Sequence, residues 1–136
     1  MVYTFTVTEQ ALDTNEAIPF LTDGVTYGSC TCHLPWTTTI QLKHTGLYFV
    51  TFNATLSTTE TEGSLSAQLQ VNGVDYPGAL ASSGVTESNS LSFSALVKVL
   101  PNCCAVPDNL PASITVVNTG VDAIYTNAAL TIIKVR

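Results

Sequence analysis

Charged residues are scarce in this chain of 136 residues: they make up 10% of it, and only four are Lys or Arg. The net charge of -6 leaves no basic stripe to neutralise phosphates, which argues against nucleic-acid binding. No apolar run approaches the roughly 20 residues that a membrane-spanning helix needs. The N-terminus alternates polar and apolar residues instead of presenting a basic segment followed by an apolar block. We therefore expect a soluble domain with no membrane insertion and no secretory signal.

Groups suited to catalysis are also few. His33 and His44 are the only histidines, and neither lies in a known catalytic motif, although nucleophilic catalysis needs a base beside its Ser, Cys or Thr. The aspartates are scattered, as Asp13, Asp23, Asp75, Asp108 and Asp122. They form neither a close carboxylate pair nor a calcium loop. The sequence predicts a protein that is not an enzyme and holds no metal or cofactor.

The chain is rich instead in strands, in which apolar residues recur with a period of two. The most informative strand covers residues 46–52, opens with Gly46 and has apolar side chains on both faces. One face carries Tyr48, Val50 and Phe52, and the other carries Leu47, Phe49 and Thr51. One face fits a hydrophobic core, so the other face needs a partner.

Similar alternation occurs in residues 3–7, 65–71, 91–99, 114–116 and 129–135, and no segment has a helical period. Turn-forming pairs separate the strands, as Asp23-Gly24, Asn72-Gly73, Pro77-Gly78, Ser83-Gly84, Pro101-Asn102 and Thr119-Gly120. No linker, repeat or charge block divides the chain. The pattern predicts one all-β domain over residues 1–136, folded as an antiparallel sandwich or jelly roll.

The order of these features resembles the jelly rolls of the tumour-necrosis-factor (TNF) and complement-head superfamily. The resemblance covers essentially the whole chain. It rests on residues 15–20, the threonine-rich strand 37–40, the strand 46–52 and the closing strand. Within that superfamily the chain is most similar to the bacterial and bacteriophage branch, which includes heads of collagen-like spore-surface proteins and phage structural proteins. The segments that carry this closer similarity are 71–74, 100–104, 117–120 and 125–128.

The resemblance implies a homotrimer whose axis passes the outward residues of the strand 46–52. Carried over, Phe49 and Thr51 lie at the trimer axis, while Tyr48, Val50 and Phe52 fill the core. The alternative is a monomeric sandwich in which Phe49 covers the second sheet and Tyr48 and Phe52 lie outside.

The resemblance also implies a function. We expect a freestanding head without a stalk or anchor, because the chain begins with its first strand and ends within its last. Such a head suits the virion surface of a phage, as a capsid decoration, head-fibre or tail-fibre protein that stabilises the particle or mediates adhesion. Its partners would be the major capsid protein or another virion protein, and a host-surface glycan or receptor. The alternative is a carbohydrate- or receptor-binding module on a bacterial or spore surface, with recognition in the loop from Tyr76 to Glu87.

The four cysteines form two close pairs in expected loops, Cys30 with Cys32 and Cys103 with Cys104. Structural zinc sites prefer two to four residues between paired cysteines, so these spacings of one and none argue against metal. Disulfides between the pairs or between protomers are a second alternative, suited to oxidising surroundings. The third is that the cysteines are small apolar fillers, and we adopt it.

Two further features have a structural and a functional interpretation. Trp36 either anchors the start of a strand or presents a stacking platform for a sugar, and packing is the more common role of a single tryptophan. The triplet Asn53-Ala54-Thr55 matches a glycosylation signal but lies in an expected strand, so we interpret it as accidental.

Overall fold

The computed structural model describes residues 1–28, 31–33, 37–59, 62–84, 90–99 and 112–136. Within these ranges the regular structure consists of β-strands. They are β1 (Val2–Thr6), β2 (Gln10–Leu12), β3 (Glu16–Ala17), β4 (Thr22–Thr26), β5 (Thr31–His33), β6 (Ile40–Leu42), β7 (Gly46–Ser57), β8 (Ser64–Val71), β9 (Val74–Gly84), β10 (Ser90–Val99), β11 (Ala112–Asn118) and β12 (Ala123–Lys134). The expected all-β class is confirmed.

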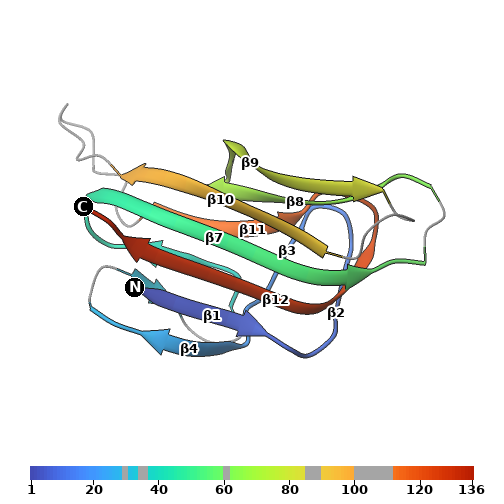
Figure 1. Cartoon of the computed structure of the whole chain (residues 1–136), viewed down its shortest axis with the longest axis horizontal. Coiled ribbons are helices and arrows are strands. Elements are labelled where there is room, and N and C mark those ends of the chain that lie inside the picture. The colour runs from blue at the N-terminus through green and yellow to red at the C-terminus, as the bar shows by residue number, and fades with distance from the viewer. Residues whose placement is uncertain (29–30, 34–36, 60–61, 85–89, 100–111) are drawn as a thin grey trace.

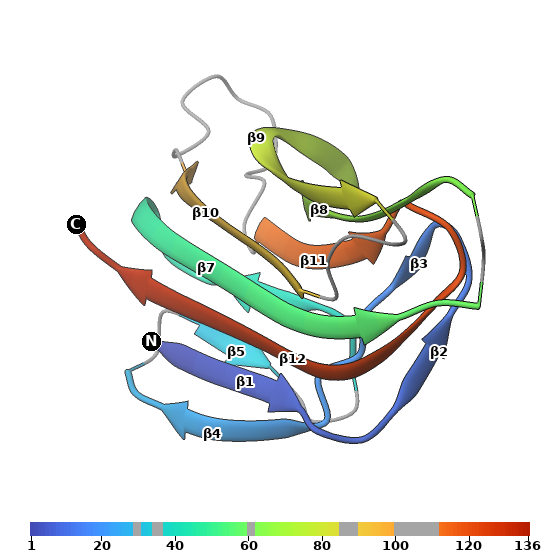
Figure 2. The same cartoon turned by 45° about the vertical axis from the view of Figure 1, so that its right-hand side comes forward.

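The strands form two antiparallel sheets stacked face to face (Figures 1 and 2). The first, which we call the β7 sheet, has the order β10-β7-β12-β1-β4, with β2 also paired to β12. The second, the β8 sheet, has the order β5-β6-β11-β8-β9, with β3 paired to β11. Because sequence neighbours such as β11 and β12 lie in different sheets, the chain crosses repeatedly between the layers, as in a jelly roll.

The core lies between the two sheets and is one cluster of buried apolar side chains. Its largest members are aromatic and come from several segments, as Tyr48, Tyr125, Phe20 and Phe52. Fully burying such a side chain contributes about 2 kcal/mol or more. This shared core holds the β7 sheet in place and leaves its other face outward.

Strand β8 differs from its expected half-buried state, because its polar residues Ser66 and Gln68 are buried as well. The Gln68 side-chain amide donates to the carbonyls of Leu69, Tyr76 and Ala79, at 2.8, 2.9 and 3.2 Å. Buried amides are tolerated when they are hydrogen-bonded in this way. These bonds support an irregular stretch of β9, where the pairing with β8 shifts register between Gln68 and Gln70.

The same stretch explains a wrong prediction. Pro77-Gly78 was expected to form a turn, but both residues lie inside β9. Gly78 adopts φ +83° there, so the pair makes a bulge in a continuing strand instead of a chain reversal. The expected recognition loop from Tyr76 to Glu87 is therefore strand as far as Gly84, and residues 85–89 lie outside the described part of the chain.

Two other expected boundaries also change. Asp23-Gly24 lies within β4, at a bulge where the register with β1 shifts between Tyr3 and Thr4. The threonine-rich strand expected from residue 37 begins only at Ile40, after an isolated bridge between Phe20 and Thr37. In contrast, Asn72-Gly73 forms the expected turn between β8 and β9, and Thr119-Gly120 lies in the turn before β12.

A buried polar pair organises the corner between β11 and β12. The Asn118 side-chain amide donates to the carbonyls of Leu12, Asp13 and Val121, at 3.3, 3.2 and 3.1 Å. Its carbonyl oxygen accepts the Tyr125 hydroxyl at 2.9 Å. Both side chains are fully buried, and burial raises the pKa of Tyr125. One amide thus ties three chain segments together at this corner.

Both chain ends lie at the same end of the sandwich (Figure 1). The N-terminal ammonium donates to the Tyr27 carbonyl at 2.7 Å, and the Leu47 amide donates to the Arg136 carbonyl at 3.0 Å. Among the described residues there is no helix long and apolar enough to cross a membrane.

Candidate functional site

The strand β7 places alternate side chains on opposite faces of its sheet. Tyr48, Val50 and Phe52 are buried in the core, and the Tyr48 hydroxyl donates to the carbonyl of His44 at 2.7 Å. Phe49 and Thr51 lie on the outward face, where Phe49 keeps 38% of its surface exposed. This arrangement is the reverse of the alternative in which Phe49 covers the second sheet. The His44 side chain itself is exposed.

Phe49 belongs to an apolar patch on this outward face. Leu96 of β10 and Ile133 of β12 are its partners in register, and they are 52% and 39% exposed. Tyr3 of β1 and Val25 of β4 pair with each other on the same sheet and are also exposed. We call Leu96, Phe49, Ile133, Tyr3 and Val25 the apolar patch. Large contiguous apolar patches of this kind mark interaction sites.

The part of the patch on β1 depends on Gly24 of β4, because a glycine leaves room for the rings beside it. The rings of Tyr3 and Phe5 lie side by side with their centroids 5.4 Å apart. A Cβ atom at Gly24 would lie 2.8 Å from the Phe5 ring and 3.0 Å from the Tyr3 ring. The rings therefore occupy the space beside β4 that any larger residue at position 24 would fill.

The outward face of β10, β7 and β12 has one charged side chain, Lys98, which is exposed near the end of β10 opposite Leu47. After the Leu96, Phe49 and Ile133 row, the outward rows across β10, β7 and β12 are Ser94-Thr51-Thr131, Ser92-Asn53-Ala129 and Ser90-Thr55-Asn127. A surface that remains in water is normally rich in charged side chains, whereas interface centres are depleted of them. This composition fits a face that another protein surface covers.

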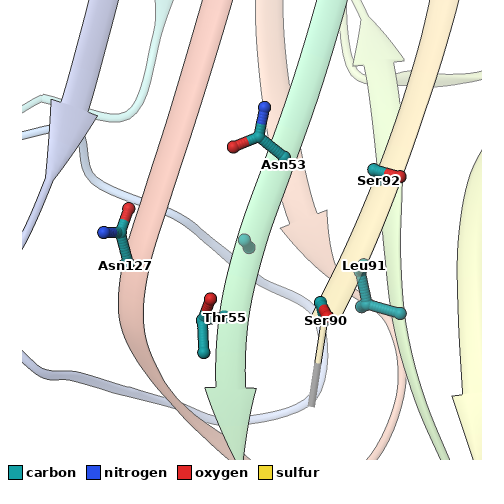
Figure 3. Close-up of a pocket in the computed structure, with 7 residues that line it drawn as sticks. Asn53, Thr55, Ser90, Leu91, Ser92 and Asn127 are labelled. Atoms are coloured by element: carbon teal, nitrogen blue, oxygen red, sulfur yellow. The ribbon is translucent and has the colours of Figure 1, made fainter. Parts of the chain in front are cut away.

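A polar pocket of about 410 Å³ opens at the end of this face away from the chain termini (Figure 3). Its walls come from three strands: Asn53 and Thr55 from β7, Ser90 and Ser92 from β10, and Asn127 from β12. Ala54 and Leu91, which are otherwise buried, complete the lining. The triplet Asn53-Ala54-Thr55, whose match to a glycosylation signal we interpreted as accidental, thus contributes all three of its residues to a pocket.

Acidic side chains gather at the corner beside Asn118. The Asp122 carboxylate accepts from the backbone N–H and the hydroxyl of Thr14, at 3.1 and 3.4 Å. The negative charge of Asp122 is the main reason why the pKa of Asp13 is raised above its usual value, and Glu16 adds to the effect. Within the described ranges, no group of three or more His, Cys, Asp or Glu side chains is placed to hold a metal ion.

Most of the expected cysteine site lies outside the described residues. Cys30, Cys103 and Cys104 fall there, and so does Trp36. Cys32 was expected in a loop but lies in β5, where it pairs with Gln41 of β6. Residues 31–33 were misassigned because three residues between turn signals are too few to show the alternation of a strand.

Solved structures identify the fold, although no model of a known protein family and no curated protein sequence matches the chain. The globular domain of zebrafish complement 1qA protein superimposes with a TM-score of 0.69 at 12% identity, over 99% of this chain and 96% of that one. The PRD1 vertex protein P5 gives 0.63 at 16% identity, over 99% and 96%. The Eiger TNF of S. frugiperda gives 0.63 at 14% identity, over 99% and 92%. The chain therefore has the TNF/C1q-like jelly-roll fold, as its sequence predicted.

Proposed function

We propose that this protein is a non-enzymatic homotrimeric head on the surface of a phage virion, with Phe49 and Thr51 at the trimer axis. The observation that carries the proposal is the outward face of the β7 sheet, which is apolar at one end and has no charged side chain in the four rows that run from Leu96-Phe49-Ile133 to Ser90-Thr55-Asn127. Its partners are two further copies of the chain and, at the particle, the major capsid protein or another virion protein.

The trimer is supported by the physical state of the apolar patch. Its five side chains are each between 38% and 52% exposed, so a second surface placed on them removes apolar area from water. Symmetric association of identical chains is the common way to cover such a face. TNF/C1q-like folds usually trimerise, which supports three copies over two.

The virion assignment is supported by the phage vertex protein among the structures with this fold. That protein and this chain cover each other almost completely, so the likeness extends over the whole jelly roll. The TNF/C1q-like fold is typically non-catalytic, which supports a structural or adhesive role. The second candidate, a binding head on a bacterial or spore surface, is favoured by one observation, the polar pocket on the same face.

Binding of the labelled, purified chain distinguishes these roles. A decoration protein binds phage particles that lack it and ignores host cells, because its contacts are with capsid surface. An adhesive head binds host cells, and excess unlabelled chain abolishes the signal. The same experiment with the Phe49→Thr variant asks whether binding needs the assembled form. If the native chain binds neither particles nor cells, the surface role is wrong.

A further inference from the structure

The turn between β8 and β9 contains an asparagine followed by a glycine, Asn72-Gly73. Asparagine is among the chemically labile residues of proteins. A following glycine increases that lability, because it has no side chain to shield its peptide nitrogen from the asparagine side chain. Both residues are exposed, and no atom beyond the chain neighbours of Gly73 lies within 4 Å of the place that a Cβ would take there. Water therefore reaches the groups that react.

The reaction replaces the side-chain amide nitrogen of Asn72 with an oxygen from water. The peptide nitrogen of Gly73 loses its proton and forms a bond to Cγ of Asn72, and the side-chain nitrogen takes up a proton and leaves as ammonia. The product is a five-membered succinimide ring. Water then adds to one of the two ring carbonyls and breaks its bond to the ring nitrogen. Opening at Cγ gives aspartate, whereas opening at the main-chain carbonyl gives isoaspartate, in which the main chain runs through the side chain.

The fold holds the Asn72 side chain on the neighbouring strand β11. The Ser113 backbone N–H donates to Asn72 Oδ1 at 2.8 Å, and the Asn72 backbone N–H donates to the Ser113 carbonyl at 2.8 Å. The main chain meanwhile turns toward β9, with φ +55° at Asn72 and +81° at Gly73. To close the ring, Cγ must turn onto the Gly73 nitrogen, and this movement breaks the bond between Ser113 and Oδ1.

We infer that Asn72 is a deamidation site and that its bond from Ser113 sets the rate, so that conversion occurs when the turn detaches from β11. Native proteins undergo such local openings without unfolding as a whole. The turn joins two strands of the β8 sheet and lies outside the outward rows of the β7 sheet. The inference therefore holds for a monomer and for a trimer alike.

The two products differ in their effect on the turn. Aspartate keeps an oxygen that accepts from the Ser113 N–H, so it preserves the contact with β11. Isoaspartate adds a carbon atom to the main chain within a turn of two residues. The register that pairs Val71 with Val74 depends on the length of that turn, so isoaspartate disrupts the pairing of β8 with β9.

Peptide mapping by mass spectrometry measures the conversion. The native protein is incubated at mildly alkaline pH in water enriched in heavy oxygen, which labels only the molecules converted during the incubation. The same incubation in guanidinium chloride gives the rate of the unfolded chain. The folded chain should convert at Asn72 about tenfold or more slowly than the unfolded chain. Equal rates in the two states, or no conversion in the unfolded chain, overturn the inference.

The chain contains an internal control for this measurement. Asn15 also adopts a positive φ, of +72°, but it is followed by Glu16, whose side chain shields the peptide nitrogen. Asn15 should convert more slowly than Asn72 in the unfolded chain. If the two convert equally there, the glycine is not the cause and the inference is wrong.

Two variants test the role of the Ser113 N–H. Ser113→Pro removes this donor, and Ser113→Ala keeps it and is the matched control. Position 113 is the second residue of β11, and a proline is tolerated near the start of a strand. Conversion at Asn72 should be about fivefold to tenfold faster in Ser113→Pro, the effect expected for one lost hydrogen bond, and unchanged in Ser113→Ala. Equal rates in the two folded variants overturn the inference.

Hydrogen exchange of the native protein gives a second measurement that needs no variant. The Ser113 amide hydrogen exchanges with solvent when its bond to Asn72 opens. At denaturant concentrations below the unfolding transition, its exchange rate and the conversion rate at Asn72 should rise in proportion. A conversion rate that does not follow this exchange overturns the inference, even where Ser113→Pro fails to fold.

Discussion

Replacing Phe49 with threonine should dissociate the assembly while leaving each protomer folded. Phe49 is 38% exposed in the single chain, which for a side chain of about 200 Å² is roughly 75 Å² available for burial at an interface. At about 25 cal/mol per Å², this area stabilises the assembly by about 2 kcal/mol for each protomer. Three copies give about 6 kcal/mol, or about four powers of ten in the dissociation constant of the trimer. Threonine is a strong strand former, so β7 itself should persist.

Sedimentation velocity over a range of concentrations measures this change, and circular dichroism reports whether the fold survives. Leu80→Thr is the matched control, because Leu80 is 53% exposed but lies on β9 in the other sheet. The control should sediment like the native protein. The reasoning is refuted if Phe49→Thr associates as tightly as the native chain, or if Leu80→Thr dissociates it equally.

Three further predictions concern the corner that joins β11 to β12. Asn118→Ala should lower the free energy of unfolding by about 3 kcal/mol in urea denaturation, because it leaves the Tyr125 hydroxyl and three carbonyls without their partner; a loss below about 1 kcal/mol would contradict this. Gly120→Ala should lower the melting temperature, since a Cβ there would meet the β8 backbone, including a nitrogen at 2.6 Å; an unchanged melting temperature would show that the turn has room for a side chain. Asp13→Asn should raise the melting temperature at neutral pH. The pKa of Asp13 is raised in the folded state, so its repulsion with Asp122 is present above that pKa and fades as the pH falls through it. The gain should therefore disappear in acid, and a gain that is independent of pH would exclude this cause.

The fold was predictable because apolar residues recur at every second position along most of its strands. In β7 the alternation alone assigned Tyr48, Val50 and Phe52 to one face and Phe49 and Thr51 to the other, and the structure has them so. The turn at Asn72-Gly73 was also predictable, because both residues adopt the positive φ angles that such a pair favours.

Other features depend on tertiary contacts that a single sequence does not display. Pro77-Gly78 has the composition of a turn, but the Gln68 amide from β8 holds the surrounding carbonyls and keeps β9 continuous. The buried role of Asn118 was at most weakly indicated in the sequence, by its position directly before the turn pair Thr119-Gly120. No sequence pattern indicated the polar pocket, because its residues come from strands far apart along the chain and meet only through sheet pairing.

The central claim is that the outward face of the β7 sheet joins three copies of this chain. The molar mass of the purified protein, measured by light scattering after size exclusion, tests it most directly. The account predicts a mass of three times the 14.4 kDa protomer, both with and without reductant. Loss of the trimer only on reduction would assign its stability to the cysteines instead of the apolar patch. A monomer under both conditions would contradict the account, because Phe49 and its neighbours would then remain in water.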